Sequence, residues 1–511
     1  MTRASATPRA DVGAGVAVVG VLVGVSLARV AFLAWGGLDL SPDEAHYWEW
    51  SRRLDWSYYS KGPLIAYLIA ALTAVLGTSV FAIRLGAVLL SVLGAWALYR
   101  LGREAFGTPA PGALAVIGLQ VTPLIWAGSL LTTIDAPFVV AWTLALWALC
   151  RALRDGGHGA WALAGLAIGV GGLAKYTMLF VLPGLALYLV RAPERRRALG
   201  LAGPALAATL ALLAFAPVLA WNARLGWISA RHVASQGRGG GLTLVHAAEF
   251  LGSQILVLTP VAAALLGWGA WVGAREGLRR GREPYRFLVA FAIPVLVAYL
   301  LVALQGKVQA NWAAAAYPPL ALATAGLLLE RRARLDPAGR RRQTALLGAA
   351  AGLALLVSAL AHVTDRLGVP AAFDPTMRLR GWAALGQAVG AEIARMPEPG
   401  RTFVVASRYQ VTSELAFYTP GRPPAYNFNL GRRMNQYDLW PGPDAKHLGW
   451  DAVYVEEGRQ PLDERVREAF ERVDPPVVVT PRSGARAGRP FAMYRAYGFR
   501  GAPRAEGPPR F

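Results

Sequence analysis

The chain has 511 residues, of which 55% are hydrophobic and 16% are charged, and its mean hydropathy is +0.37. A soluble chain of this length carries about a quarter charged residues, so the composition excludes an ordinary soluble globular protein. The net charge of +21 does not indicate nucleic-acid binding, because the basic residues fall in short groups between apolar runs. Cys150 is the only cysteine, which excludes an intrachain disulfide.

Apolar runs of about 20 residues, the length that a helix needs to cross a bilayer, recur through the first 360 residues. The first begins near Val12 and ends at Trp35. It is too long for the core of a cleaved signal peptide and has no clear A-x-A site, so we interpret it as a retained span. The pattern predicts about eleven spans, within a range of roughly ten to thirteen: Ala14–Trp35, Val80–Arg100, Ala113–Leu131, Ala136–Leu153, Ala160–Ala174, Tyr176–Val190, Leu199–Trp221, Phe250–Val272, Phe287–Leu304, Trp312–Leu329 and Ala345–Ala361.

The arginines give the orientation of these spans, because cytoplasmic connections are enriched in positive charge. Alternate connections hold them: Arg3 and Arg9; Arg100 and Arg103; Arg151 and Arg154; Arg191 and Arg195 to Arg197; Arg275, Arg279, Arg280, Arg282 and Arg286; Arg331, Arg332, Arg334 and Arg340 to Arg342. We therefore expect a multi-pass protein of the cytoplasmic (inner) membrane with a cytoplasmic N-terminus. Everything after the last span is expected outside the cytoplasm.

The first outer loop, residues 36–79, contains the stretch DLSPDEAHYWEWSRR. Ser41, Pro42 and Glu44 predict a helix start closed by a capping box. The aromatic residues that follow are typical of a helix lying in the membrane interface. No cap requires Asp43, which makes it a candidate reactive carboxylate, although acidic residues favour helix N-termini in any case.

Only four of the 52 basic residues are lysines, and Lys61, Lys175 and Lys307 all fall in or beside outer connections. Lysine is a compact point charge, which suits an anion such as a phosphate at the membrane surface. Snorkelling toward lipid headgroups explains each lysine separately just as well. Three lysines on the face where positive charge is otherwise scarce favour a ligand.

Other polar residues of the outer connections are weaker candidates. Asp135 begins the fourth span, where capping and function both account for it. His46, Arg231 and His232 are typical of hydrogen-bonding surface residues, and the histidines show no metal-ligand spacing. The pattern therefore predicts no metal site and no cofactor, and it leaves a dependence on a divalent metal open.

After the last span the composition becomes that of a soluble domain, expected over residues 370–500. A helix pattern at Ala384–Arg395 and strand-like runs at Phe403–Ala406, Ala452–Val455 and Val477–Val479 predict a small α/β fold. Residues 501–511 are expected to be a disordered tail. The fold class is thus a mainly α membrane helix bundle, residues 1–365, with interfacial helices in its first outer loop and a C-terminal α/β domain.

The motifs in the outer connections resemble those of the C-type membrane glycosyltransferases, which use polyprenyl-phosphate sugars. The resemblance covers most of the chain and rests on PDEAHYWEW, Lys61-Gly62-Pro63 after LDWSYYS, TTIDAP, GLAKYT and KVQANW. SRYQVTSELAFYTPG and NQYDLWPG are similar to the soluble domain of one bacterial branch. Gly62 departs from the pattern, because this family more usually has proline there.

The resemblance implies a role for each matching residue. Asp43 is expected to be the base that acts on the acceptor, supported by Glu44, and Lys61 is expected near the lipid phosphate. The other expected substrate contacts are Asp135, Lys175, Tyr176, Lys307, Asn311 and Trp312, with Tyr59, His46, Arg231 and His232 as weaker candidates. In the outer domain Arg408, Tyr409 and Tyr437 are candidate polar contacts, and packing within the domain is their simpler interpretation.

The implied activity is transfer of a monosaccharide from a polyprenyl-phosphate donor to an acceptor hydroxyl of a lipid glycan, a polysaccharide or a protein. One displacement would invert the anomeric centre. The donor, the acceptor and membrane lipid are the expected partners, and nucleic acid is not. A transporter or flippase for a lipid-linked anionic saccharide is the alternative, and it predicts charged residues near the midplane of the membrane instead of at one face.

Overall fold

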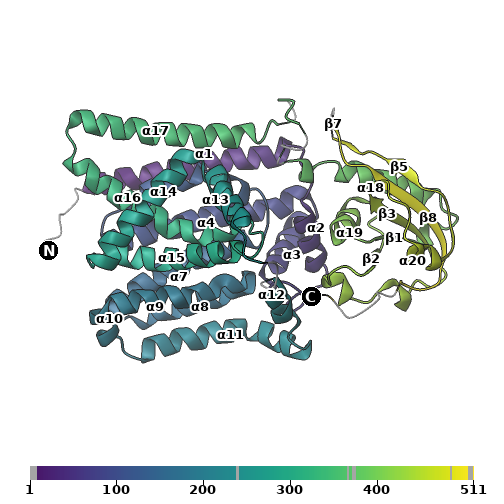
Figure 1. The fold of residues 1–511 in the computed structure, drawn as a ribbon, viewed down its shortest axis with the longest axis horizontal. Helices are drawn as coiled ribbons and strands as arrows, with labels where there is room; N and C mark the ends of the chain where they lie inside the picture. The colour runs from purple at the N-terminus through teal and green to yellow at the C-terminus, as the bar shows by residue number, and fades with distance from the viewer. Residues whose placement is uncertain are drawn as a thin grey trace.

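A computed structural model describes residues 8–236, 241–364, 367–370, 374, 376–483, 486–503 and 510. A bundle of helices forms one end of the molecule and an α/β domain forms the other (Figure 1). Most of the expected tail, residues 504–509 and 511, lies outside the described residues.

The helices of the bundle follow one another with short connections. They are α1 (Pro8–Trp35), α2 (Pro42–Ser51), α3 (Leu64–Leu76), α4 (Val80–Phe106), α5 (Ala110–Gln120), α6 (Pro123–Gly128), α7 (Asp135–Asp155), α8 (His158–Ala174), η1 (Tyr176–Phe180), α9 (Val181–Arg191), α10 (Pro193–Ala198), α11 (Ala202–Arg224), α12 (Ile228–Gln236), α13 (Leu244–Leu258), α14 (Pro260–Ala274), η2 (Arg275–Arg279), α15 (Glu283–Ala303), η3 (Ala310–Ala316), α16 (Tyr317–Arg334) and α17 (Pro337–Leu360).

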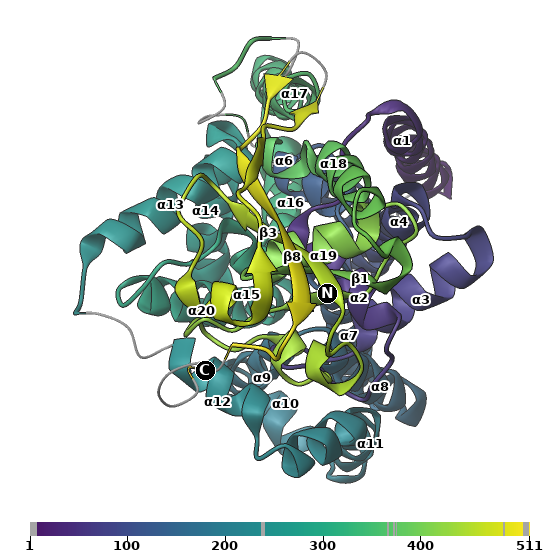
Figure 2. The ribbon, with the colours of Figure 1, turned by 90° about the vertical axis from the view of Figure 1, so that its right-hand side faces the viewer.

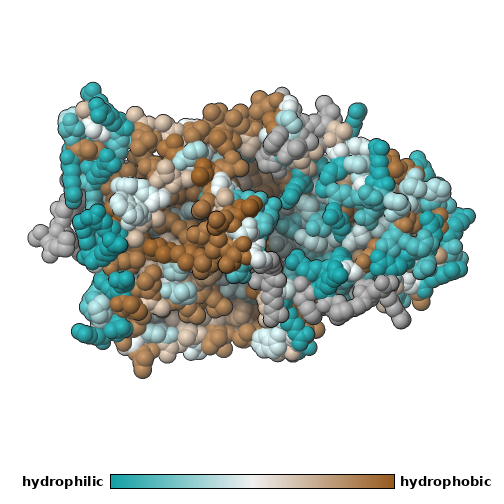
Figure 3. All heavy atoms as spheres, viewed as in Figure 1, coloured by the Kyte–Doolittle hydropathy of each residue, from teal (hydrophilic) through white to brown (hydrophobic). Residues whose placement is uncertain are grey.

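Seven helices in the described part of the chain are long and apolar enough to cross a membrane, or up to eight if α13 and α14 form one broken span. These two meet at an angle of 112°, at Thr259, which has a φ of 76°, and Pro260, which has no amide hydrogen to continue the helix. On the face shown in Figure 3, apolar residues form a broad band across the bundle. The protein is therefore a multi-pass membrane protein. All eleven expected spans fall on helical segments, several of them shorter than a span, and the count of about eleven stays a prediction.

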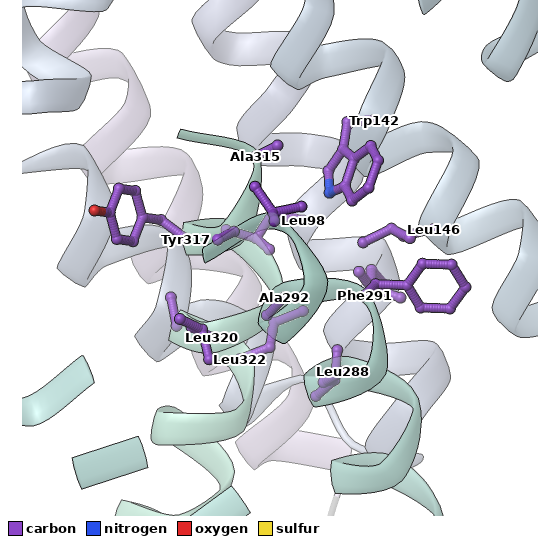
Figure 4. Packing of buried hydrophobic residues seen from close by; sticks show 14 of the residues in the cluster. Leu98, Trp142, Leu146, Leu288, Phe291, Ala292, Ala315, Tyr317, Leu320 and Leu322 are labelled. Carbon is purple, nitrogen blue, oxygen red and sulfur yellow. The ribbon is translucent and has the colours of Figure 1, made fainter. Parts of the chain in front are cut away.

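The bundle buries a large apolar core around α4, α7, α15 and α16. Figure 4 shows Leu146 of α7 beside Phe291 of α15, with Trp142 of α7 on the same side and Tyr317 of α16 on the opposite side of the cluster. Because helices that face lipid gain little from burying apolar groups, close packing of this kind holds the bundle together. It gives the outer ends of α4, α7 and α8 fixed positions.

The C-terminal domain is a mixed sheet with two main helices. Its strands lie in the order β2-β1-β3-β8-β4, with β5 also paired to β8; β1 runs parallel to β2 and β3, whereas β8 runs antiparallel to β3, β4 and β5. Its elements are η5 (Met377–Leu379), α18 (Trp382–Ala394), η6 (Pro399–Arg401), β1 (Thr402–Ala406), α19 (Tyr409–Tyr418), β2 (Ala425–Asn427), η7 (Gln436–Asp438), η8 (Pro443–Ala445), β3 (Asp451–Glu457), α20 (Glu464–Glu468), β4 (Phe470–Val473), β5 (Val477–Val479), β6 (Arg482–Ser483), β7 (Arg486–Ala487) and β8 (Phe491–Phe499). The expected α/β fold, with its helix and three strand-like runs, is confirmed.

The domain and the first outer loop share one hydrophobic core, which explains why the sheet lies directly over the end of the bundle (Figure 2). Trp48 and Trp50 of α2 pack in this core, and both are at most 2% exposed. The carboxylate of Asp39 accepts hydrogen bonds from the backbone N–H groups of Trp382 and Ala383 at the start of α18. The expectation that the aromatic residues of α2 anchor it in the lipid interface is therefore wrong: they anchor it to the domain.

Candidate active site

Glu44 lies on the closed side of α2 and is fully buried. The expected capping box is confirmed, since Ser41 Oγ accepts from the Glu44 N–H and Glu44 Oε2 accepts from the Ser41 N–H. Arg84 donates to both Glu44 carboxylate oxygens over 2.9 and 3.0 Å, and the Thr132 N–H adds a further bond. Burial alone would raise the pKa of Glu44, but the Arg84 charge and these hydrogen bonds hold it below its ordinary value.

These contacts correct the expected substrate-binding role of Glu44. Its carboxylate is occupied by protein donors and has no access to solvent. It ties the first outer loop to α4 and to the turn before α7. Glu44 is thus a structural residue.

Asp43, one residue earlier, points away from this cluster and is reached by solvent. The Tyr409 hydroxyl, at the start of α19, donates to Asp43 Oδ1 over 3.1 Å. Protein surrounds the carboxylate on most sides, and this partial loss of water raises its pKa, against the opposing effects of Tyr409 and the Lys61 charge. Asp43 is therefore an accessible carboxylate whose affinity for a proton is increased.

A second polar cluster lies on the same side. Asp135, at the start of α7, accepts from Lys175 Nζ over 2.8 Å and from Asn311 Nδ2 over 2.5 Å. These three residues come from α7, the end of α8 and η3, and all three are among the substrate contacts that the resemblance implied. The Lys175 ammonium is buried and paired with Asp135. We had expected it to be unpaired and available to bind the phosphate of a ligand.

Lys61 lies between the two clusters. It is half-buried, and its ammonium forms no hydrogen bond or ion pair within the described part of the chain. Burial, and then the Lys175 charge, lower its pKa to about 8, although Asp135 and Asp43 act in the opposite direction. The neighbouring Gly62 allows this position, because a Cβ there would lie 2.2 Å from the Leu173 carbonyl oxygen of α8. The departure from proline thus has a steric reason.

Several weaker candidates have structural contacts instead. His46 is buried, bonds Ser413 through Nδ1, and packs against Trp50, Tyr409 and Tyr437. Burial and the charge of Arg432 lower its pKa to about 3, so it is neutral at physiological pH. Tyr437 is buried and bonds Ser413 as well, which agrees with its interpretation as a packing residue.

The remaining candidates are described by their own contacts. Tyr176 contacts Ser57 of the first outer loop through its hydroxyl, and Trp312 packs against Tyr299. Arg408 is exposed and pairs with Glu457 over 2.8 Å, which agrees with its simpler interpretation as a residue that stabilises the domain. Lys307 is exposed in the turn before η3, with no ion pair or hydrogen bond inside the described ranges.

Tyr59, Arg231 and His232 belong to the region beside Lys61. Tyr59 is buried and its ring packs against His232 at a tilt of 51°, with ring centroids 4.8 Å apart. Burial and the charges of Arg433 and Lys61 lower the pKa of His232 to about 4. Arg231 is exposed on α12.

An apolar cavity opens beside the Asp135 cluster. Its volume is about 250 Å³, and it is lined by residues of α4, α5, α6, α7 and η3, among them Leu90, Leu98, Leu119 and Val139, with Asp135 and Asn311 among its polar residues. Sequence reasoning missed this cavity and also missed Arg84 and Arg433. Among the described residues, three or more His, Cys, Asp or Glu side chains nowhere gather as metal ligands would.

Comparisons with known proteins show what this sequence and fold resemble. Residues 60–221 match the family model described as dolichyl-phosphate-mannose-protein mannosyltransferase. ArnT from Cupriavidus metallidurans, solved with undecaprenyl phosphate bound, has the same fold, with a TM-score of 0.65 at 18% identity over 93% of this chain and 97% of that chain. The chain therefore has the same fold as ArnT, and its residues 60–221 are similar to the mannosyltransferase family.

Two curated relatives are similar in sequence. The lipid A galacturonosyltransferase RgtD of Rhizobium johnstonii is 30% identical over 302 residues, which cover 58% of this chain and 62% of that protein. The undecaprenyl phosphate-alpha-4-amino-4-deoxy-L-arabinose arabinosyl transferase of Edwardsiella ictaluri is 31% identical over 36% of this chain and 37% of that protein. The matches therefore span about three fifths of the first relative and over a third of the second.

Proposed function

We propose that the chain transfers a monosaccharide from a polyprenyl-phosphate donor to a hydroxyl group of a lipid acceptor. The observation that carries the proposal is the position of Asp43: it faces Lys61 and the Asp135 cluster, and the apolar cavity opens beside that cluster. A carboxylate, a free ammonium group and an apolar recess are what this reaction requires. The names of the relatives support a lipid acceptor and a polyprenyl-phosphate donor.

The reaction is one displacement at the anomeric carbon. The acceptor oxygen forms a bond to that carbon as the bond to the lipid phosphate breaks, which inverts the configuration. Asp43 accepts the proton of the acceptor hydroxyl late in this step, when positive charge on the sugar makes the hydroxyl more acidic. The hydrogen bond from Tyr409 fixes one Asp43 oxygen and leaves the other for the acceptor.

Lys61 stabilises the leaving phosphate. Its ammonium has no protein partner among the described residues, so it can hold the charge that develops on the departing polyprenyl phosphate. Asp135 and Asn311 lie between this position and the apolar cavity, where they can bind the sugar hydroxyls. The cavity accommodates the isoprene units nearest the phosphate.

The distribution of arginine supports a position of this site at the outer face of the cytoplasmic membrane. A lipid-linked donor can reach that face through the bilayer. The C-terminal domain covers the site from the outside and supplies Tyr409.

Mass analysis of envelope lipids tests the proposal. Cells that express the chain should contain a lipid heavier by one monosaccharide, which is absent when the gene is deleted and absent when Asp43→Asn is expressed at the same level. Identical lipids in all three strains, under conditions in which the donor is made, would contradict it.

A further inference from the structure

The loop between β2 and η7 lies on the turn that carries Lys61. Met434 packs against the cluster of Tyr59, Trp221 and Ile228. Gln436 Oε1 accepts a hydrogen bond of 2.6 Å from the Tyr59 N–H. The C-terminal domain therefore holds this loop against Tyr59, which is two residues before Lys61 in the sequence.

Two consecutive arginines of the loop have different surroundings. Arg432 binds both carboxylate oxygens of Asp438, over 2.8 and 3.1 Å, and also donates to the Ser407 carbonyl. Arg433 is exposed, and its guanidinium forms no hydrogen bond or ion pair with any described residue. Its guanidinium is close enough to lower the pKa of both Lys61 and His232.

The space beside Arg433 is built for an anion. The Arg433 guanidinium is not paired with a carboxylate within the described ranges, and its positive charge acts on both Lys61 and the Tyr59 hydroxyl. Tyr59 is 2% exposed, and its hydroxyl has no hydrogen-bond partner among the described residues. A buried hydroxyl without a partner is uncommon in proteins, and a ligand oxygen would satisfy it.

We propose that Arg433 and Tyr59 form a subsite for an oxyanion of the acceptor, such as a phosphate group of the lipid that receives the sugar. This inference rests on the proposed function. The apolar cavity for the donor lies on the Asp135 side of the site, whereas Arg433 comes from the C-terminal domain. An acceptor held by Arg433 places its hydroxyl toward Asp43, because Tyr409, which bonds Asp43, also lies within range of the Arg433 charge.

Binding without transfer tests the subsite. The full-length chain in lipid nanodiscs is titrated with phosphorylated lipid A, with dephosphorylated lipid A and with undecaprenyl phosphate. Arg433→Ala should weaken binding of phosphorylated lipid A by about tenfold or more, as expected for a lost charge-assisted bond. Binding of the other two probes should not change.

Two further variants sharpen the result. Tyr59→Phe keeps the ring contact with His232 and removes the hydroxyl, so it should weaken the binding of phosphorylated lipid A alone, by a factor of about five. Arg401→Ala is the matched control: Arg401 is an exposed arginine paired with Glu398 at the opposite end of β1 from Tyr409, and its loss should change no affinity.

Three outcomes would overturn the subsite. They are unchanged binding of phosphorylated lipid A to Arg433→Ala, an equal loss for its dephosphorylated form, and a loss for undecaprenyl phosphate, which would assign Arg433 to the donor. Failure of the proposed function is distinguishable, because selective binding that depends on Arg433 would persist in a wild-type chain that transfers no sugar.

Discussion

Two neighbouring carboxylates of α2 have different surroundings: Glu44 lies on a closed, buried side of the helix and Asp43 on an open, accessible side. On the closed side, Glu44 is fully buried and its oxygens accept from Arg84, the Ser41 N–H and the Thr132 N–H. On the open side, Asp43 accepts one hydrogen bond, from Tyr409, and is reached by solvent. Adjacent residues of a helix point about 100° apart, so one turn of helix can serve both purposes.

The difference shows how a buried charge can be assigned to structure or to chemistry. Glu44 has exchanged water for a full set of protein donors, and it has nothing left to offer a ligand. Asp43 has lost part of its water and has gained one donor, so its pKa rises and an oxygen stays available. The same contrast separates Lys175, paired with Asp135, from Lys61.

Asp43→Asn should give the largest effect on the open side. The amide cannot accept the proton of the acceptor, so we expect the rate of sugar transfer to fall by about 10²- to 10⁴-fold. Thermal unfolding in detergent should be nearly unchanged, because the side chain is accessible. Transfer within about threefold of the wild type would contradict the assignment of the base.

Glu44→Ala should remove the buried ion pair on the closed side of α2 and destabilise the fold. Removing one partner of a buried ion pair leaves Arg84 without its counter-charge, at an expected cost of about 3–5 kcal/mol in the free energy of unfolding. Chemical unfolding of the purified chain measures it. The double variant Glu44→Met with Arg84→Met should recover much of the loss, since it leaves no lone charge; a double variant less stable than either single variant would argue against a coupled pair.

Lys61 predicts a pH dependence on the open side. Its pKa of about 8 lies below that of an ordinary lysine, so the ammonium is present at neutral pH and is lost as pH rises through about 8. Affinity for undecaprenyl phosphate should fall by about tenfold across that step. Lys61→Arg should remain charged and keep its affinity at higher pH. An affinity that falls in the same way in both proteins would exclude Lys61 as the titrating group.

Glu414 of α19 should give a smaller effect, on stability alone. It is fully buried, and neither carboxylate oxygen has a hydrogen-bond partner among the described residues. Burial, with the charges of Asp39 and Glu44, raises its pKa well above the ordinary value, against Arg84 and Arg489.

The raised pKa of Glu414 means that stability is greatest below the ordinary carboxyl pKa and is lost as pH rises toward the folded-state pKa. Glu414→Gln cannot ionise and should remove that loss, making the variant more stable than the wild type at neutral pH by about 1 kcal/mol. Parallel stability curves from acid to neutral pH for both proteins would show that Glu414 does not titrate.

The sequence was sufficient for local features and insufficient for contacts between distant elements. Ser41, Pro42 and Glu44 specify the helix start because a capping box is local, and Asp43 was left without a structural role on the same grounds. Arg84 could not be recognised as the partner of Glu44, because it lies inside an apolar span 40 residues away. The apolar cavity arises from the packing of several helices that are distant in the sequence, which no local pattern encodes.

The same distinction between local features and distant contacts applies to the C-terminal domain. Its strands and its first helix follow from apolar runs and were predicted. Tyr409 was one of three candidates there, and only its packing across α2 separates it from Arg408, which turns toward Glu457. Arg433 looked like its neighbour Arg432, and the difference between them depends on the fold of one loop.

The central claim is that the open side of α2 transfers a sugar from a polyprenyl phosphate. The most direct measurement supplies the purified chain in nanodiscs with a polyprenyl-phosphate sugar and lipid A, and follows both products. We expect one glycosylated lipid A for each polyprenyl phosphate released. A donor that stays intact, or that only crosses the bilayer when the chain is placed in sealed vesicles, would contradict the account.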